Sequence, residues 1–332
     1  MPGLPMKFHV LASFAIAAVL ATQVSVAGPL RDRLAERRAQ HEQHGQQDVR
    51  QDGELDDGHG GGPARVPDGV RVLRNEAYGA DPLQRFDVYL PQARLQQPAP
   101  VLFLVHGGGW RRGDKAMSNV VENKVAHWVP RGFIVISTNY RMLPDTRPVD
   151  QARDVAAALA AAQQRAANWG ADPGKFVLIG HSAGAHLVAY LAASPATASA
   201  AGARPWLGTV ALDSAGYDIP KVMQERHFRL YDEAFGNDPQ YWQLASPYHQ
   251  LAQASAPLLA VCSSRRVTSC QQAHAFVARD ASLGARAGTL EKDMSHAQIN
   301  ERLGADPVYT AEVERFLQQL DPAIDTLLRR NP

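Results

Sequence analysis

The sequence carries almost no net charge. Its 332 residues include 34 lysines and arginines and 33 aspartates and glutamates, which give a formal net charge of +1. Proteins that bind nucleic-acid backbones need a broad basic surface, so this balance argues against that class, and we expect no nucleic-acid partner. The chain is 45% hydrophobic, which is enough for the core of one large domain or of two smaller ones.

Long hydrophobic runs are also scarce. One run, residues 10–21, follows Lys7 and is too short to span a membrane comfortably. Small residues at 25–27 offer a cleavage site before Gly28, so residues 1–27 are predicted to be an export signal peptide. We therefore expect a secreted or periplasmic protein with no stable membrane anchor after cleavage; the alternative is a retained N-terminal anchor.

Cysteine is nearly absent. The two cysteines, Cys262 and Cys270, both lie in the segment CSSRRVTSC. Export would place them in a compartment where disulfides persist, so we expect a bridge between them. The alternative is a pair of buried free thiols, because spacing in the sequence does not establish that the Cβ geometry permits a bond.

Large apolar residues are sparse between residues 28 and 67, a segment rich in Arg, Gln, Gly and Asp. Such a composition buries too little surface to offset the entropy lost on ordering, so residues 28–67 are predicted to be a flexible polar leader. Its histidines, His41, His44 and His59, lack the cysteines or regularly spaced carboxylates of a metal site. The rest of the chain has no metal or cofactor motif either, and we expect neither group.

Residues 68–332 alternate short apolar runs with longer helical ones. The runs with strand character are VRVLRNEAY, QRFDVYL, PVLFLV, FIVIST, FVLI, LGTVALD, APLLAVC and AGTLEK. Apolar strands separated by helices predict an α/β domain with a doubly wound, mainly parallel sheet covered on both faces. The irregular aromatic segment 215–251 is predicted to be a cap insertion over the ligand crevice, with surface decoration as the alternative.

The segment FVLIGHSAGAHL, residues 176–187, takes the chain from a strand into a helix. Ser182 stands at the corner, with Gly180 and Gly184 two places away on either side. A tight turn of this kind excludes bulky neighbours and holds the serine hydroxyl clear of the sheet. The pattern predicts that Ser182 is a nucleophile and that the N–H of Ala183 faces the same space.

The segment LFLVHGGGW, residues 102–110, places three glycines directly after a strand. Consecutive glycines let the backbone turn its amides toward a substrate oxygen. We expect Gly108 and Gly109 to form an oxyanion hole together with Ala183. Removing one such donor costs about 3–4 kcal/mol of transition-state stabilisation.

These motifs resemble those of a known superfamily. HGGGW and GHSAG, with STNYR and GADPGKFVLIG between them, are similar to the esterase and lipase branch of the α/β-hydrolases, notably acetylesterase-like and hormone-sensitive-lipase-like enzymes; HGGGW and GHSAGAHL are also similar to arylformamidases. The resemblance covers roughly residues 70–320 and implies serine chemistry without specifying a substrate. It implies that Tyr140 and Arg141 support the glycine loop. Trp110 is expected in the wall of the acyl pocket or, as the alternative, in the core.

His296, in DMSHAQIN, follows the last predicted strand, where such enzymes carry the catalytic histidine. The other histidines of the domain belong to the two glycine motifs, to helices or to the insertion. We therefore expect His296 to be the base that takes the proton of Ser182.

The catalytic acid is where the sequence departs from the family pattern. In most of the superfamily it follows the penultimate strand, but LLAVCSSRRVTSC contains neither Asp nor Glu, and Thr268 stands near the expected place. Asp213 ends an earlier strand and preserves the order Ser, Asp, His, so it is the favoured candidate. The alternatives are Asp293 or Glu291, and a site with no carboxylate.

Taken together, the sequence predicts an exported serine hydrolase that cleaves small-molecule carboxylic esters with short to medium acyl chains. One alternative is an arylformamidase-like amide hydrolase. The other, from a different class, is a non-catalytic binding protein on a hydrolase fold, which the missing carboxylate after the penultimate strand suggests.

Overall fold

The computed structural model describes residues 62–93 and 95–330. The predicted signal peptide, residues 1–27, and the leader as far as residue 61 lie outside the described residues. Contacts with the domain begin before the predicted end of the leader: Pro63 pairs with Met117 in an antiparallel bridge, and the N–H of Ala64 donates to the carbonyl of Ala116.

One sheet of eight strands organises the domain. The strands are β1 (Val70–Ala77), β2 (Arg85–Pro91), β3 (Ala99–Val105), β4 (Ile134–Thr138), β5 (Ala171–His181), β6 (Gly208–Leu212), β7 (Leu258–Ser263) and β8 (Ala287–Lys292). They lie in the order β1-β2-β4-β3-β5-β6-β7-β8, with β1, β2 and β4 paired antiparallel and all later pairs parallel. The predicted α/β class with a mainly parallel sheet is confirmed.

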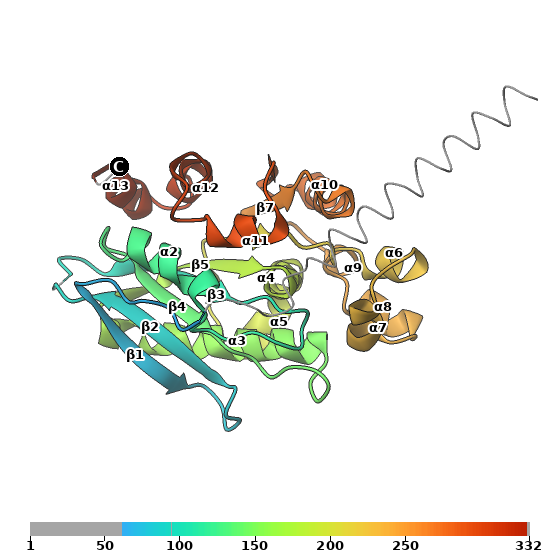
Figure 1. The fold of residues 1–332 in the computed structure, drawn as a ribbon, viewed down its shortest axis with the longest axis horizontal. Coiled ribbons are helices and arrows are strands. Elements are labelled where there is room, and N and C mark those ends of the chain that lie inside the picture. The colour runs from blue at the N-terminus through green and yellow to red at the C-terminus, as the bar shows by residue number, and fades with distance from the viewer. Residues whose placement is uncertain (1–61, 94, 331–332) are drawn as a thin grey trace, which may run out of the picture. The chain divides into compact units, whose positions relative to one another are not determined.

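Helices cover both faces of the sheet (Figure 1). Successive residues of a strand point to opposite faces, and β3 shows the consequence. Val101 and Phe103 pack in a cluster with α3 (Pro148–Arg165), α4 (Ala183–Ala193) and α10 (Val267–Ser282). Leu102 and Leu104 pack in a second cluster with α2 (Ser118–Trp128), α12 (Pro307–Gln318) and α13 (Pro322–Arg330). Both faces are therefore apolar, which explains the nearly continuous apolar strands.

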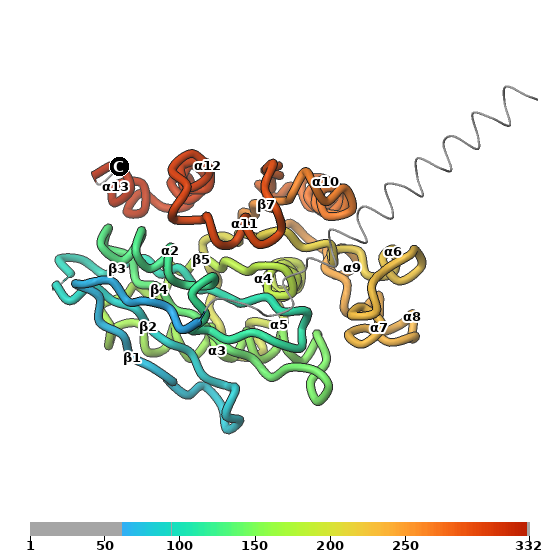
Figure 2. Tube along the Cα trace, viewed as in Figure 1, coloured from blue at the N-terminus to red at the C-terminus, as the bar shows by residue number. Residues whose placement is uncertain are grey.

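The remaining helices are short. They are η1 (Ala166–Trp169), α5 (Pro195–Ala200), α6 (Ile219–Gln224), α7 (Arg229–Phe235), α8 (Pro239–Leu244), α9 (Pro247–Gln250) and α11 (His296–Glu301). Helices α6 to α9 make up the insertion between β6 and β7, and α6, α7 and α8 gather on the right-hand side in Figure 2. Within the described ranges, we find no helix long and apolar enough to cross a bilayer.

Candidate active site

The corner between β5 and α4 holds Ser182 in an unusual backbone conformation. Its φ is 53° and its ψ is −117°. Positive φ is uncommon for a residue with a side chain and persists only where the surroundings enforce it. Here the N–H of Ser182 donates to the carbonyl of Leu212 at 2.9 Å, which ties the corner to the end of β6.

The glycines beside the corner are required by contact distances. A Cβ at Gly180 would lie 2.2 Å from the carbonyl oxygen of Gly184, and a Cβ at Gly184 would lie 2.2 Å from that of Val105. Both distances are far inside van der Waals contact with backbone that cannot move aside. Both glycines of the G-x-S-x-G pattern are therefore needed because α4 lies so close to strands β3 and β5.

The HGGGW loop is held by its own backbone and by Tyr140. Gly108 has a φ of +113°, and a Cβ there would lie 2.2 Å from the carbonyl oxygen of Arg112. The N–H of Arg112 in turn donates to the carbonyl of Gly108 at 2.9 Å. The Tyr140 hydroxyl donates to the carbonyl of His106 at 3.0 Å, and the two rings stack. Tyr140 thus supports the loop, the position that the family resemblance implied.

Trp110 connects this loop to the insertion. It is 3% exposed, and its ring packs against Tyr231 and Phe235 of α7. The indole N–H donates to His186 Nδ1 at 3.2 Å, so His186 must carry its proton on Nε2, which lies 2.8 Å from the carbonyl of Ala245. Burial lowers the pKa of His186 to about 4 and keeps it neutral. Trp110 lines the site cavity and is also a buried packing residue, so both interpretations of it apply.

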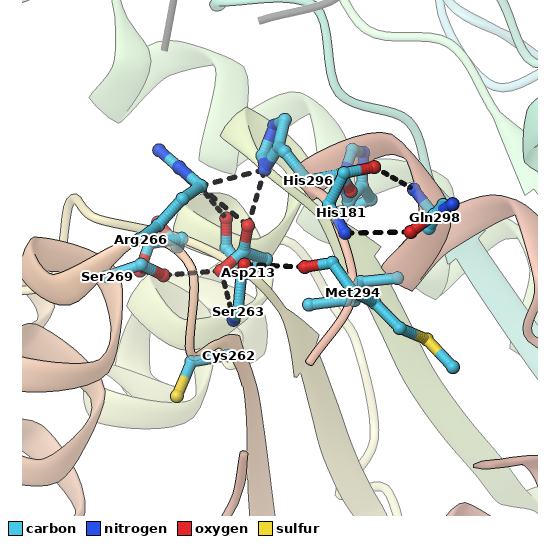
Figure 3. Close-up of polar contacts among 12 residues, drawn as sticks. His181, Asp213, Cys262, Ser263, Arg266, Ser269, Met294, His296 and Gln298 are labelled. Carbon is cyan, nitrogen blue, oxygen red and sulfur yellow. Dashed lines mark hydrogen bonds and ion pairs between the residues drawn. The ribbon is translucent and has the colours of Figure 1, made fainter. Parts of the chain in front are cut away.

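His296 is the first residue of α11 and is 7% exposed. Its Nδ1 lies 2.6 Å from Asp213 Oδ2 (Figure 3). The ring of His181 lies beside that of His296, with 4.4 Å between the ring centroids, and His181 Nε2 donates to the carbonyl of His296 at 3.0 Å. Burial, followed by the proximity of His296, holds the pKa of His181 well below its usual value, so His181 is a neutral neighbour that fixes the backbone of His296.

Asp213 follows β6 directly, has a φ of 54° and is fully buried. Oδ1 accepts hydrogen bonds from the N–H of Ser263 at 2.8 Å and from Ser269 Oγ at 2.5 Å. Oδ2 accepts one from Arg266 Nη1 at 2.6 Å and faces His296 Nδ1. Burial alone would raise the pKa of Asp213, but the charge of Arg266 and the hydrogen bond to His296 hold it well below its usual value. The carboxylate is therefore ionised and fully satisfied.

The other candidate acids lie elsewhere. Asp293 is exposed and pairs with Arg265 at 2.7 Å, and Glu291 pairs with the exposed His274 at 2.7 Å. Thr268 lies in the first turn of α10, and the neighbouring Ser269 supplies the hydroxyl that donates to Asp213. Of the carboxylates weighed from the sequence, Asp213 is the one that the structure brings to His296.

The partners of Asp213 on segment 263–269, which runs from the end of β7 into the first turn of α10, were not anticipated from the sequence. This segment supplies the donors of Ser263, Arg266 and Ser269, and the disulfide between Cys262 and Cys270 joins the residues on either side of it, with a Cα–Cα distance of 5.2 Å. The bridge has an S–S distance of 2.00 Å. The run of arginines in CSSRRVTSC was the one available signal, but it does not say which arginine points inward.

A cavity of about 510 Å³ connects these parts. Its walls include Ser182, His296, Asp213, the glycines of the HGGGW loop and Ala183, and residues 229–231 of α7 also line it. The structure thus brings the predicted nucleophile, base, acid and oxyanion residues to one space. The insertion contributes directly to its wall.

A nucleophile corner at the carboxyl end of β5, combined with this strand order, defines an α/β-hydrolase fold. In sequence, the chain is similar to curated proteins described as esterases or carboxylic ester hydrolases. The family model BD-FAE matches residues 86–204.

Several curated proteins are similar in sequence. The probable isoprenylcysteine alpha-carbonyl methylesterase ICME of Oryza sativa subsp. japonica is 32% identical over 171 residues, which cover 50% of this chain and 40% of the relative. Esterase LipC of Mycobacterium tuberculosis is 27% identical over 239 residues, which cover 65% of this chain and 59% of the relative. The chain therefore spans less than two thirds of either relative's length.

Solved structures show the same fold. Esterase B from Lactobacillus rhamnosis HN001 matches with a TM-score of 0.62 and 20% identity, over 90% of this chain and 96% of that one. A truncated carbohydrate esterase from gut microbiota matches with a TM-score of 0.66 and 18% identity, over 78% of this chain and 99% of that one. At these identities the likeness concerns the fold alone.

Proposed function

We propose that this protein is a serine hydrolase that cleaves carboxylic esters through an acyl-enzyme intermediate. The observation that carries the proposal is the convergence of Ser182, the Asp213–His296 pair and the HGGGW glycines on one cavity. The similarity in sequence to proteins described as esterases supports the choice of ester substrates. A non-catalytic role on the same fold would not require this set of residues to meet.

In the proposed reaction, Ser182 Oγ attacks the ester carbonyl carbon while His296 Nε2 takes the hydroxyl proton. His296 Nδ1 is committed to Asp213, which fixes Nε2 as the proton-accepting atom. The ionised Asp213 stabilises the imidazolium that forms. The N–H groups of Gly108, Gly109 and Ala183 stabilise the negative oxygen of the tetrahedral intermediate.

The same groups then complete the turnover. His296 gives its proton to the departing alkoxide, which leaves as the alcohol and leaves Ser182 acylated. A water molecule, deprotonated by His296, attacks the acyl carbonyl, and the second tetrahedral intermediate collapses to the free acid and the Ser182 hydroxyl. None of these proposed steps uses a cofactor.

We propose that the preferred acyl chains are short to medium in length. A cavity of about 510 Å³ lies within the size range of small-ligand pockets. Trp110, Leu230 and Tyr231 line it and offer apolar contact to an acyl group. The location that we propose is outside the cytoplasm, in the periplasm or secreted, and the disulfide supports it because disulfides persist in oxidising compartments.

The test is a series of p-nitrophenyl esters with acyl chains from acetate to palmitate, assayed with the wild type, Ser182→Ala and Ser199→Ala. Ser199 is an exposed serine of α5 outside the cavity lining and is the matched control. We expect hydrolysis of the shorter esters, loss of about four to six orders of magnitude in kcat for Ser182→Ala, and retained activity in the control. A folded wild type that hydrolyses none of the esters would contradict the proposal.

A further inference from the structure

The side chain of Arg266 reaches both members of the acid–base pair. Its Nη1 lies 2.6 Å from Asp213 Oδ2, 3.3 Å from the backbone carbonyl oxygen of Asp213 and 2.8 Å from His296 Nδ1 (Figure 3). Arg266 is 7% exposed and also lines the active-site cavity. A buried, permanent positive charge beside a catalytic histidine is not needed for the reaction described above, so it calls for its own explanation.

The protons on Arg266 Nη1 and His296 Nδ1 determine the nature of this contact. A guanidinium nitrogen can only donate, and Nδ1 must itself carry a proton if it is to donate to Asp213. The Arg266–His296 approach is then a contact between two donors that converge on the same carboxylate oxygen. The negative charge of Asp213 is shared between a cation that is always present and one that appears only when the imidazole is protonated.

We propose that Arg266 is a positioning residue of the catalytic pair, which clamps Asp213 and opposes protonation of His296 in the resting enzyme. The inference rests on the proposed hydrolase function. With Arg266 present, the neutral imidazole gives a site in which the carboxylate and guanidinium charges balance, whereas the imidazolium gives a net positive site. Burial strengthens this difference because the surroundings screen charges poorly. His296 should therefore remain unprotonated down to a lower pH than it would in an Asp–His pair without Arg266.

The other groups near His296 do not supply this effect. His181 on β5 is neutral and donates to the backbone carbonyl of His296. Lys124 on α2 bonds the backbone and side-chain oxygens of Asn300 in α11, and the Tyr309 hydroxyl of α12 bonds the carbonyl of Ile299. Asp293, in the preceding loop, is held by Arg265. Of these groups, Arg266 is the cation whose side chain directly contacts the imidazole.

The position of Arg266 also accounts for the missing carboxylate. The loop after β7, where the family resemblance placed the acid, carries a cation in this chain, and the acid stands at the end of β6 instead. The loop contributes the partners of the acid rather than the acid itself. A carboxylate at residue 266 would face Asp213 at short range and repel it, whereas the arginine pairs with it at 2.6 Å.

The test compares Arg266→Gln with Arg265→Gln. Arg265 is the adjacent residue, but its side chain is 46% exposed and pairs with Asp293, away from the site. The measurement is kcat/KM for a short p-nitrophenyl ester across pH 5 to 9, with circular dichroism to verify folding. Arg266→Gln should lose about 10- to 100-fold in kcat/KM at the pH optimum, the usual effect of removing a hydrogen bond to a buried charge. Its acid limb should move to higher pH by about one unit, while Arg265→Gln should match the wild type.

Two further variants keep the test decisive. Arg266→Lys retains the charge and should keep the acid limb of the wild type even if its rate falls, and it serves as the readout if Arg266→Gln does not fold. In Arg266→Ala, millimolar guanidinium should restore part of the lost rate, with no such gain for Arg265→Ala.

Two results would overturn the inference: an unchanged rate in Arg266→Gln, or a reduced rate with the acid limb of the wild type and no guanidinium rescue in Arg266→Ala. A wild type with no esterase activity would instead overturn the proposed function, so the two failures are distinguishable.

Discussion

The two sides of the site differ in what holds them in place. The nucleophile side comprises residues 106–113 and 180–184, and the acid–base side comprises Asp213, segment 263–269 and His296. The nucleophile side is shaped by backbone: glycines at which a Cβ would lie 2.2 Å from a carbonyl oxygen, and a serine at φ 53°. The acid–base side is shaped by side-chain hydrogen bonds between residues 50 to 83 positions apart in the chain.

This difference has a physical consequence. Steric constraints are satisfied by short, local patterns, and a side chain added in the wrong place displaces the backbone. A buried charge network instead depends on every partner being present, because an unsatisfied buried carboxylate is costly. The nucleophile side should therefore be sensitive to added atoms, and the acid–base side to removed charges and hydrogen bonds.

Among substitutions that leave Ser182 in place, the largest effect is expected on the acid–base side, from Asp213→Asn. The amide keeps the size of the carboxylate but removes the charge that stabilises the imidazolium, and it favours the wrong histidine tautomer. We expect kcat to fall by about four orders of magnitude. Asp293→Asn is the matched control, since its carboxylate is 83% exposed and pairs with Arg265. Equal losses in the two variants would show that Asp213 is not the acid.

On the nucleophile side, Gly108→Ala should have the next largest effect. The new Cβ would lie 2.2 Å from the Arg112 carbonyl oxygen, so the loop must shift and the amides of the oxyanion hole move with it. We expect kcat to fall about 100- to 1000-fold, as when one oxyanion donor is lost.

Gly109→Ala is the comparison for that variant. A Cβ there meets no atom within 4 Å, and the cost is the positive φ of 60° alone. The expected loss is about tenfold or less, because a left-handed residue with a side chain costs roughly 1–2 kcal/mol, part of which falls on stability rather than on rate. Equal kinetic losses in the two variants would contradict a steric origin.

Removing the disulfide tests the loop that holds Asp213. In the double variant Cys262→Ala/Cys270→Ala, the free energy of unfolding should fall by about 2–3 kcal/mol, the chain-entropy value for a loop of this length. Below its unfolding transition, kcat should fall only a fewfold, because the hydrogen bonds to Asp213 can still form. Denaturant titration and steady-state kinetics measure the two effects, and a stability equal to that of the wild type would refute a clamping role.

The smallest effect on catalysis is expected at Lys124, whose side-chain nitrogen bonds Asn300 in the helix that begins with His296. Burial lowers the pKa of Lys124 to about 7 from its ordinary 10.5. Between these values the unfolded chain binds a proton that the folded chain does not, so the free energy of unfolding should rise with pH, by at most about 1.4 kcal/mol per unit.

Below pH 7 both states are protonated, and the folded state carries the whole cost of burying the charge. Lys124→Met should lack this dependence, whereas Lys221→Met, at an exposed position, should keep it. Denaturant titrations at pH 6, 8 and 9.5 provide the measurement. Parallel stability curves for the wild type and Lys124→Met would contradict the assignment.

The difference between local backbone constraints and long-range side-chain hydrogen bonds also determined what could be predicted from the sequence. The sheet class, the nucleophile corner and the glycine loop depend on local backbone requirements, and these leave a local pattern in residues 106–110 and 180–184. His296 was favoured by its place after the last strand. Asp213 remained one of several candidates, because its partners come from a loop 50 or more residues away. Arg266 was missed because nothing local distinguishes its inward side chain from the outward one of Arg265.

The end of the leader was predicted less accurately for a related reason. Residues 62–67 were assigned to the leader by composition, but Pro63 pairs with Met117, and the N–H of Arg65 donates to Glu122 Oε2 of α2. These contacts join distant parts of the chain, so composition does not indicate them.

The most direct test of the account is to find where a fluorophosphonate probe binds. Peptide mapping by mass spectrometry should place the adduct on Ser182 in the wild type. His296→Ala should slow labelling strongly at the same serine, while His274→Ala, at an exposed position, should not. An adduct on another residue, or labelling of Ser182 at the same rate without His296, would contradict the claim that these two side chains act together.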